Sequence, residues 1–358
     1  DRPMEAALLV TPEESHHSLS IFLSRAGVHH ACETPMASTL IQARAMAAEA
    51  AKAGVALHVN EQFFRRDLLA FSRQIIATGA IGEVGRVVIH GGHGGPHDNS
   101  ILMAYAGSRR PVAVNAIEHV MPVARHKELY NRWFEEEHYL LRAVHFSSGF
   151  LGVNTAANHK GALGRQSRPG YMEVQGARGT FIESGVRAEW PWMSTAEIRI
   201  ASAADMQEFS YAKRYPLHAV LSPAPDAARS SEIPYHGDLA SLGVDLPGGQ
   251  MTYANPTLGQ GIADNYISSV ALATLDFVRA VRGGTPREFS TDDAVATMEI
   301  ETGFRLSAAR NGARIELPLA GDPAVDLEDH EALRKKHGRD PLDVEAMIDL
   351  AFPKTYVG

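Results

Sequence analysis

The stretch AALLVTPEESHHSLSIFLSRAGVHHAC, residues 6–32, reads as a buried strand, a helix and a second strand. Its first five residues are apolar without interruption, which is typical of a strand that is covered on both faces. Helix-start signals follow, because Thr11 suits the N-cap, Pro12 the first helical position and Glu14 the capping box. Gly27 ends the helix, and VHHAC begins the second strand.

The same alternation continues along the chain for two further units. Strand-like runs at 28–32 and 56–60 are followed by helical patterns at 38–54 and 67–79, and each helix ends at a glycine. Strands that alternate with helices of this length predict a parallel, doubly wound sheet.

The carboxyl ends of the three predicted strands define a candidate binding edge, because ligands of such sheets bind there. The edge carries short polar turns, namely Thr11–Pro12, Glu33–Thr34–Pro35 and Asn60–Glu61–Gln62. A dinucleotide-binding sheet normally opens with a strand, a glycine-rich G-x-G-x-x-G turn and a helix. No such fingerprint is visible in the sequence, and the imitation at Gly92-x-Gly94-x-x-His97 lacks the third glycine.

The pattern changes after residue 82. A long strand is predicted at 82–92 and a short helix at 97–107, and HYLLRAVHFSSG, FLGVNTAANH and the hairpin YMEVQGARGTFIES follow as strands. Strands without intervening helices favour an antiparallel sheet. Two helices return at 265–284 and 291–312.

Composition limits the classes of partner and compartment. The net charge is −8, there is no Lys/Arg-rich run, and no apolar stretch reaches eighteen residues, so neither nucleic acid nor a membrane is the expected partner. The single cysteine, Cys32, excludes an internal disulfide and a multi-cysteine zinc site. It also fits a reducing compartment, so we expect a cytoplasmic protein.

Several stretches together resemble the glucose–fructose oxidoreductase / inositol dehydrogenase (Gfo/Idh/MocA) family. They are LLVTPEES…ALHV (8–59), GAIGEVGRV (79–87), EVQGARGTF (173–181) and FVRAVRGG…AARNG (277–312). The resemblance implies a Rossmann domain, a larger α/β domain with an open sheet, NAD or NADP as cofactor, and a small-molecule substrate such as a sugar or polyol. It also implies a homo-oligomer that forms through the open sheet.

The expected fold class is therefore α/β, with a partial Rossmann-type parallel sheet and a larger α/β domain whose open sheet is mostly antiparallel. A chain of 358 residues is long for a single core. We expect the second half of a nucleotide-binding domain at 1–82, a substrate and oligomerisation domain at 83–320, and a C-terminal extension at 321–358. The pattern leaves open whether the helix at 291–312 packs back on the first domain.

Two departures from the family's hallmarks concern proton transfer. The family has Glu-Lys-Pro after the second strand, and its lysine helps to move a proton, whereas this chain has Thr34 at that position. A threonine hydroxyl donates a hydrogen bond but has no pKa near neutrality. The second hallmark resembles D-x-G-x-H-x-x-D, and counting back from Gly107 places His97 at the histidine and His93 and Ser100 at the two aspartates.

The resemblance thus implies a catalytic set in which His97 is the remaining acid or base and Thr34, Ser100 and His93 are its neighbours. It also implies contacts with the cofactor at the strand-end edge. The cofactor-binding candidates are Thr11, Pro12, His16, Glu33 and Pro35.

Three functional hypotheses remain open. The first is an NAD(P)-dependent oxidoreductase with altered chemistry, and the second is a non-redox relative that binds a sugar or serves as a partner subunit. The third is a lyase, epimerase or hydrolase built on the histidines of HGGHGGPHD (90–98). These histidines and Asp98 carry atoms that suit zinc. The intervening glycines and proline break a continuous helix, so no metal site is expected.

Overall fold

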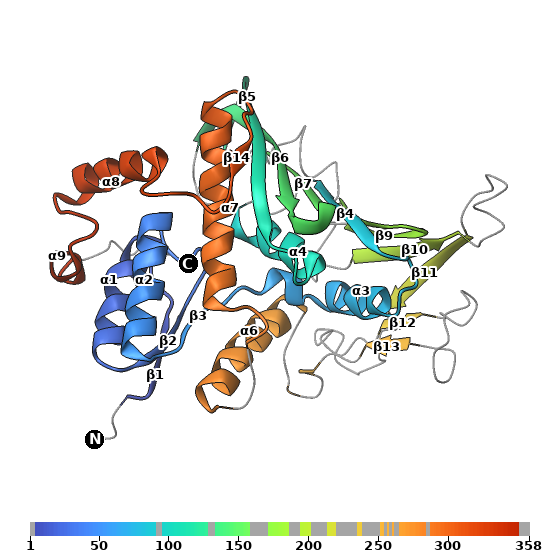
Figure 1. Ribbon diagram of the computed structural model, residues 1–358, viewed down its shortest axis with the longest axis horizontal. Coiled ribbons are helices and arrows are strands. Elements are labelled where there is room, and N and C mark those ends of the chain that lie inside the picture. The colour runs from blue at the N-terminus through green and yellow to red at the C-terminus, as the bar shows by residue number, and fades with distance from the viewer. Residues whose placement is uncertain are drawn as a thin grey trace. The chain divides into compact units, whose positions relative to one another are not determined.

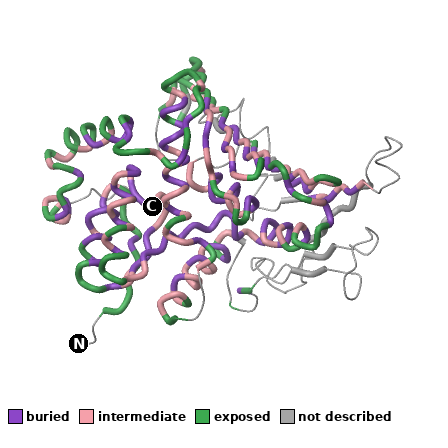
Figure 2. Tube along the Cα trace, in the orientation of Figure 1, coloured by how far each residue is buried: buried purple, intermediate pink, exposed green. Residues whose placement is uncertain are grey.

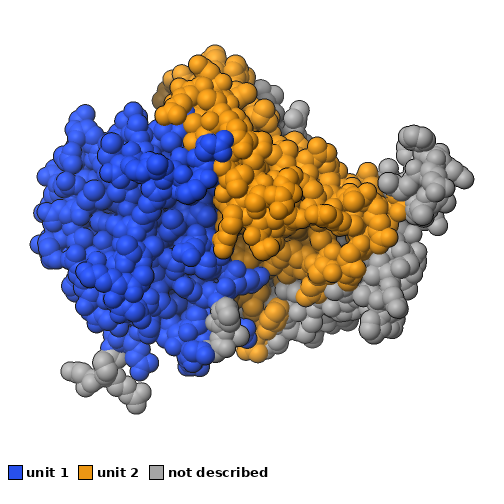
Figure 3. All heavy atoms as spheres, viewed as in Figure 1, with its two compact units in different colours: residues 1–61, 273–306, 316–358 blue, residues 62–272, 307–315 orange. Residues whose placement is uncertain are grey.

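The computed structural model divides into two compact units, each built from segments distant in the sequence (Figures 1 and 3). The described residues are 4–90, 95–127, 133–157, 171–185, 194–201, 213–219, 235–237, 251–253, 256–257, 260, 265–283 and 287–350. Unit 1 contains residues 1–61, 273–306 and 316–358, and unit 2 contains residues 62–272 and 307–315. The boundary therefore precedes the expected residue 82, and the expected C-terminal extension is part of unit 1.

Unit 1 contains the parallel sheet that the sequence predicts. The strands are β1 (Ala6–Leu9), β2 (His29–Cys32) and β3 (Leu57–Val59), which pair in parallel in the order β1-β2-β3. Helix α1 (Glu13–Arg25) connects the first two strands, and α2 (Leu40–Ala53) connects the second and third. Helix α1 is buried over most of its length, including the four consecutive residues 15–18, whereas α2 buries its first turns and becomes exposed towards its end (Figure 2).

Local signals set the ends of these helices. Thr39 is the N-cap of α2, and its side chain accepts a hydrogen bond from the Gln42 N–H. Gly54 ends α2 with a φ of 69°, which suits glycine. The start of α1 differs by one residue from the prediction, because Pro12 occupies the N-cap and the Thr11 hydroxyl instead accepts from Ser15 Oγ at 2.7 Å.

Helices from the C-terminal third complete unit 1. They are the last part of α6 (Asn265–Val281), most of α7 (Thr291–Ala309), α8 (Ala324–His337) and α9 (Val344–Ile348). Helix α8 caps the start of α2, because Asp326 Oδ2 accepts from the Ile41 N–H at 3.0 Å and His330 Nε2 lies 2.8 Å from Thr39 Oγ1. The segment after Gly321, for which the sequence predicted no structure, is therefore integral to the first unit.

A second sheet forms the centre of unit 2 and contains eleven strands among the described residues, in the order β13-β12-β11-β10-β9-β8-β4-β7-β6-β5-β14. Its strands are β4 (Val84–His90), β5 (Pro111–Lys127), β6 (Trp133–Phe146), β7 (Leu151–Ala157), β8 (Tyr171–Gly176), β9 (Gly179–Gly185), β10 (Ser194–Ile200), β11 (Lys213–Ala219), β12 (Tyr235–Gly237), β13 (Met251–Tyr253) and β14 (Ile315–Glu316). Strands β4 and β7 are parallel, whereas β4–β8, β5–β6, β6–β7 and β8–β9 are antiparallel. The predicted open, mostly antiparallel sheet is confirmed.

One face of this sheet is covered and the other is open. Val114 and Val144 are paired across β5 and β6 and are fully buried, whereas Ile117 and Leu141, a pair further along that faces the other way, are 55% and 45% exposed. Helix α4 (Pro96–Ala106) packs on the covered face so closely that a Cβ on Gly152 would lie 2.8 Å from Leu102 Cδ1. The short helix η1 (Phe63–Arg65) and α3 (Asp67–Ala77) precede β4. No described helix is long and apolar enough to cross a membrane.

Candidate functional site

The strand ends of unit 1 form one edge, as the alternation of strands and helices predicted. The backbone N–H of Glu33 donates to Leu9 O at 3.0 Å, and that of Asn60 donates to Cys32 O at 2.9 Å. Each of these two turns therefore begins directly after the last backbone hydrogen bond between the paired strands. The Thr34–Pro35 peptide bond is cis, and Glu33, Thr34 and Pro35 are all half-buried.

His16 brings two of these turns together. Its side chain is buried, with Nδ1 at 3.1 Å from Pro35 O and Nε2 at 3.0 Å from Thr11 O. Burial lowers the pKa of His16, and hydrogen bonds to the backbone of Pro35, Thr11 and Met36 oppose that shift. Thr11 and Pro12 are exposed. Four of the predicted cofactor residues thus lie on one contiguous edge with Glu33.

Asn60 belongs to the same edge, although sequence reasoning did not select it as a site residue. Its side chain is 3% exposed, and Nδ2 donates to Glu33 Oε1 at 3.4 Å. Within the described part of the chain, no donor lies within hydrogen-bond distance of Asn60 Oδ1. A buried acceptor without a donor is unusual in a folded protein and is often found where a ligand or a water binds.

The neighbouring Cys32 is not a candidate nucleophile. The thiol is fully buried at the end of β2, and burial raises its pKa to about 12. The thiolate is the reactive form of cysteine, so this side chain is inert at neutral pH.

His97 lies in unit 2, in the first turn of α4. Gly95 precedes the helix with a φ of 60°, and Pro96 is its first residue. The His97 ring is half-buried and lies on Phe63, with 4.2 Å between ring centroids and a tilt of 36°. Sequence reasoning missed this contact, because 30 residues separate the end of η1 from the start of α4 and neither segment has a sequence pattern that indicates contact with the other.

The same aromatic group extends to the start of α6. Tyr266 meets Phe63 edge-on at 6.0 Å between centroids, and the Gln62 amide Nε2 donates to Tyr266 Oη at 3.3 Å. Phe63 and Gln62 are buried, at 7% and 4% exposure, so the half-buried rings of His97 and Tyr266 are the accessible part of this group.

A buried pair fixes the first turn of α4 on the large sheet. Asp98 is 2% exposed and accepts from Asn154 Nδ2 on β7 at 2.5 Å. Ser100, a predicted site residue, is 1% exposed and donates from Oγ to the backbone carbonyl of His97 at 2.8 Å. His97 therefore projects from a turn that is held by two side-chain contacts.

The remaining histidines of the glycine-rich turn do not form a metal centre among the described residues. His90 on β4 lies with Nδ1 at 3.1 Å from Thr155 Oγ1. Among the residues that the structure describes, no group of three or more His, Cys, Asp and Glu side chains is placed to hold a metal ion. His93 lies outside the described residues.

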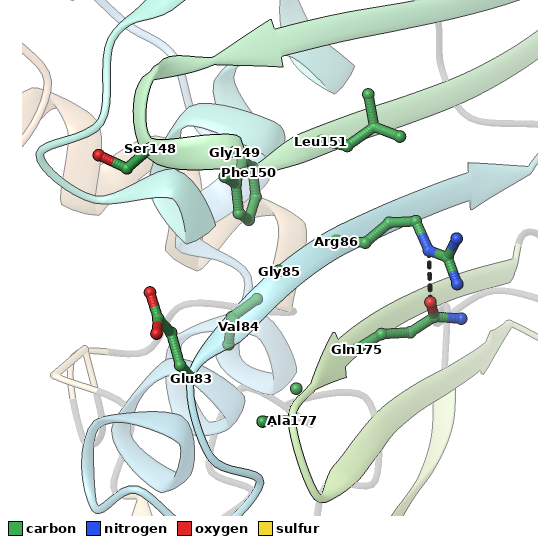
Figure 4. Close-up of a pocket in the computed structure, with 11 residues that line it drawn as sticks. Glu83, Val84, Gly85, Arg86, Ser148, Gly149, Phe150, Leu151, Gln175 and Ala177 are labelled. Atoms are coloured by element: carbon green, nitrogen blue, oxygen red, sulfur yellow. Dashed lines mark hydrogen bonds between the residues drawn. The ribbon is translucent and has the colours of Figure 1, made fainter.

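A cavity of about 510 Å³ opens at the rim of the large sheet (Figure 4). The starts of β4 and β7 and the end of β8 line it, and Arg86 Nε on β4 donates to Gln175 Oε1 on the neighbouring β8 at 2.5 Å. Glu83 at its margin pairs with Arg109 at 3.0 Å. None of the predicted site residues lines this cavity, and its charged groups are already engaged, so it is not the candidate site.

Part of the chain is similar in sequence to known oxidoreductases. Residues 1–61 match the family model described as an oxidoreductase family with an NAD-binding Rossmann fold. The 1,5-anhydro-D-fructose reductase of Ensifer adhaerens is 35% identical over 98 residues, which cover 27% of this chain and 29% of that protein. The D-apiose dehydrogenase of Paraburkholderia graminis is 39% identical over 74 residues, 21% of this chain and 20% of that protein. The chain thus matches less than a third of the length of each curated relative.

Solved structures share the fold over a much larger part of the chain. An NAD binding oxidoreductase from Klebsiella pneumoniae has a TM-score of 0.60 at 19% identity, covering 88% of this chain and 80% of its own. Levoglucosan dehydrogenase, in complex with NADH and levoglucosan, has a TM-score of 0.60 at 17% identity, covering 89% of this chain and 82% of its own. The class is therefore an α/β fold shared with these oxidoreductases. The family match of residues 1–61 and the partial identity of the curated relatives agree with the predicted resemblance to the Gfo/Idh/MocA family over those parts of the chain, and the solved structures show the shared fold.

Proposed function

We propose that the chain is an NAD(P)-dependent oxidoreductase acting on a sugar, a polyol or a related small hydroxy compound. The observation that carries this proposal is the edge of unit 1, where His16 joins the turns after β1 and β2 beside the unsatisfied acceptor of Asn60. The match of residues 1–61 to a family with an NAD-binding Rossmann fold supports it.

The groups present at this edge fit part of a nicotinamide dinucleotide. The Thr11 hydroxyl, the Glu33 carboxylate and Asn60 Oδ1 suit the hydroxyl and amide donors of such a cofactor, and Pro12 and Pro35 flank them. A pyrophosphate instead needs a glycine-rich turn at a helix N-terminus, and unit 1 shows no such turn within its described residues. We therefore assign one end of the cofactor to these residues. When bound, the cofactor would supply the hydride donor or acceptor.

His97 is the proposed acid or base. Oxidation of a hydroxyl requires a group that takes its proton, and a neutral imidazole does so near neutral pH. The start of α4 favours the neutral form, because the positive end of the helix dipole disfavours a second positive charge. Thr34 would contribute a hydrogen bond rather than a charge, and Ser100 holds the backbone of His97. The proposed role of His93 as a neighbour remains a prediction.

The aromatic group around His97 suits a ring-shaped polyhydroxy substrate. The half-buried Tyr266 can contact the C–H face of a sugar ring, and the buried Phe63 and Gln62 hold its ring and its hydroxyl. One structural neighbour is an inositol dehydrogenase homolog from Azotobacter vinelandii in complex with NADH and myo-inositol. The identity of the substrate is therefore proposed only as a class.

The protein, expressed with any residues that precede Asp1 in its natural form, is expected to bind NADH or NADPH. A dissociation constant below about 1 mM, or more than about 4 kcal/mol of binding free energy, is the expected result. Energy transfer from tryptophan to the reduced nicotinamide and calorimetric titration would measure it. The Asn60→Ala variant should bind more weakly, whereas Asn115→Ala, an amide in unit 2 held by Gly312 O, serves as the control. Absence of binding at millimolar nucleotide would exclude the proposal.

A non-redox relative is the second candidate function. Thr34 in place of lysine favours it, because the position that normally carries charge is neutral. Such a protein would bind a sugar or polyol through the unit 2 residues without binding nucleotide. The same titrations, repeated with a panel of hexoses and cyclic polyols, distinguish the two functions.

We also propose that the chain forms a homo-oligomer through the open face of the large sheet. Ile117, Tyr139 and Leu141 are 55%, 44% and 45% exposed, and they lie side by side on β5 and β6. Contiguous apolar residues on an open sheet favour association. Sedimentation velocity should show a particle larger than the 38.8 kDa monomer, and Leu141→Glu should dissociate it. Phe22→Glu, an equally exposed position on α1, should not. A monomeric wild-type protein would contradict this assignment.

A further inference from the structure

The His16 side chain is in an unusual position for a histidine, because both of its ring nitrogens face backbone carbonyl oxygens. Nε2 lies 3.0 Å from Thr11 O and Nδ1 lies 3.1 Å from Pro35 O. The ring is 1% exposed, so solvent does not compete for these contacts. The two carbonyls belong to turns that follow neighbouring parallel strands and are separated by 23 intervening residues.

The chemistry of the ring limits what it can do there. A neutral imidazole has one N–H and one lone pair, and a carbonyl oxygen only accepts. Burial lowers the pKa of His16, so the neutral form is present at neutral pH and one of the two contacts is a hydrogen bond at any moment. The ring nevertheless fills the space between both turns and sets their separation.

We propose that His16 is a positioning residue that holds the end of β1 and the Glu33–Thr34–Pro35 turn at a fixed separation. Its donated hydrogen bond and its planar ring together act on the backbone, and no contact between His16 and a ligand is needed. The expected effect of His16 on cofactor binding rests on the proposed function. The expected effect of His16 on the two turns is independent of that function.

The adjacent His17 provides a matched control. It is 3% exposed and lies in the same turn of α1, but its Nδ1 has no hydrogen-bond partner among the described residues. Burial is the main cause that lowers the pKa of His17, and repulsion from His330 of α8 adds to it. Removing either histidine removes a buried ring, but only His16 contacts the two strand-end turns.

Amide hydrogen exchange on the full chain tests the proposal. In His16→Phe, peptides that cover residues 33–37 should exchange about tenfold faster than in the wild type, because a turn that has lost one hydrogen bond to its carbonyl opens more often and exposes the Glu33 amide bonded to Leu9 O. His17→Phe should leave exchange at 33–37 unchanged. His16→Gln, whose amide can still donate, should restore slow exchange. Should His16→Phe fail to fold, His16→Met, a flexible side chain without a donor, replaces it in the comparison with His16→Gln.

Two results would overturn the inference. One is wild-type exchange at 33–37 in the variants without a donor, and the other is equal acceleration in His16→Phe and His17→Phe. A parallel titration with NADH should show weaker binding in His16→Phe than in His16→Gln. If the wild type itself binds no nucleotide, the proposed function fails, while the exchange measurements still decide the role of His16.

Discussion

Replacing His97 with alanine is expected to reduce kcat/KM by about 10²–10⁴-fold, the range by which a positioned acid or base accelerates proton transfer. The melting temperature should change by only a few degrees, because the ring is half-buried at the start of a helix and lies outside the central packing of the large sheet. Nucleotide-dependent oxidation of a panel of hexoses and cyclic polyols, together with calorimetric melting, would measure both quantities.

A surface histidine supplies the comparison for His97. His138 on β6 is exposed at 44% of its side chain and pairs with Glu118, so His138→Ala should retain activity. A second variant, His97→Gln, keeps hydrogen bonding but cannot take up a proton, and it should be nearly as inactive as the alanine variant. Full activity in His97→Gln would assign a binding role to this residue instead, and unfolding of His97→Ala would assign a structural one.

Acidification should destabilise unit 1 through His17. Burial, reinforced by the charges of His330 and Arg25, lowers the pKa of His17 to about 4 from 6.5. The unfolded chain therefore binds the proton more readily than the folded chain, and stability that is complete above pH 6.5 is lost as the pH falls towards 4. The loss amounts to about 3 kcal/mol, at roughly 1.4 kcal/mol per pH unit of difference.

Denaturant titrations between pH 7 and pH 4 would show this dependence as a falling unfolding midpoint. His17→Leu removes the titrating group, so the stability lost between pH 7 and pH 4 should be smaller by the contribution of His17. The matched variant His138→Ala should lose as much stability as the wild type. His16, His30 and His330 also have lowered pKa values, mainly through burial, and should account for part of the remaining slope. An identical slope in His17→Leu and the wild type would show that His17 titrates normally.

Local patterns predicted much of the fold. The alternation of strands and helices across residues 6–79 can be predicted because helices begin and end at residues with clear preferences. In α2 these residues are the N-cap Thr39 and the C-cap Gly54. The order of strands in the large sheet was not predictable in this way. Strand β4 lies between β7 and β8, an arrangement that depends on packing between segments about sixty and eighty residues apart. Helix α8 was missed because its contacts with Thr39 and Ile41 span nearly 300 residues.

The candidate site was likewise predictable from the sequence only in part. The rule that strand ends of a parallel sheet meet at one edge was enough to group Thr11, Glu33 and Pro35. The family resemblance added His97. Contacts that depend on two side chains from distant segments, such as Phe63 with His97 and Asp98 with Asn154, leave no signal in a single sequence. The orphaned oxygen of Asn60 becomes visible only when all of its neighbours are known.

The assembly of unit 1 from three separated segments has a consequence for how the protein is made. The ribosome makes residues 4–59 before α7 and α8, which contact them in unit 1 and follow more than 200 residues later. Protein synthesis proceeds at about 5–20 residues per second, so these two helices are made on the order of ten seconds or more after the residues of the β1–β3 sheet. During that interval most of unit 2, residues 62–272, is synthesised. Residues 4–59 are therefore made before unit 2 but can complete their packing only after most of it has been made, so they are exposed to chaperones and proteases for longer than the other segments of unit 1.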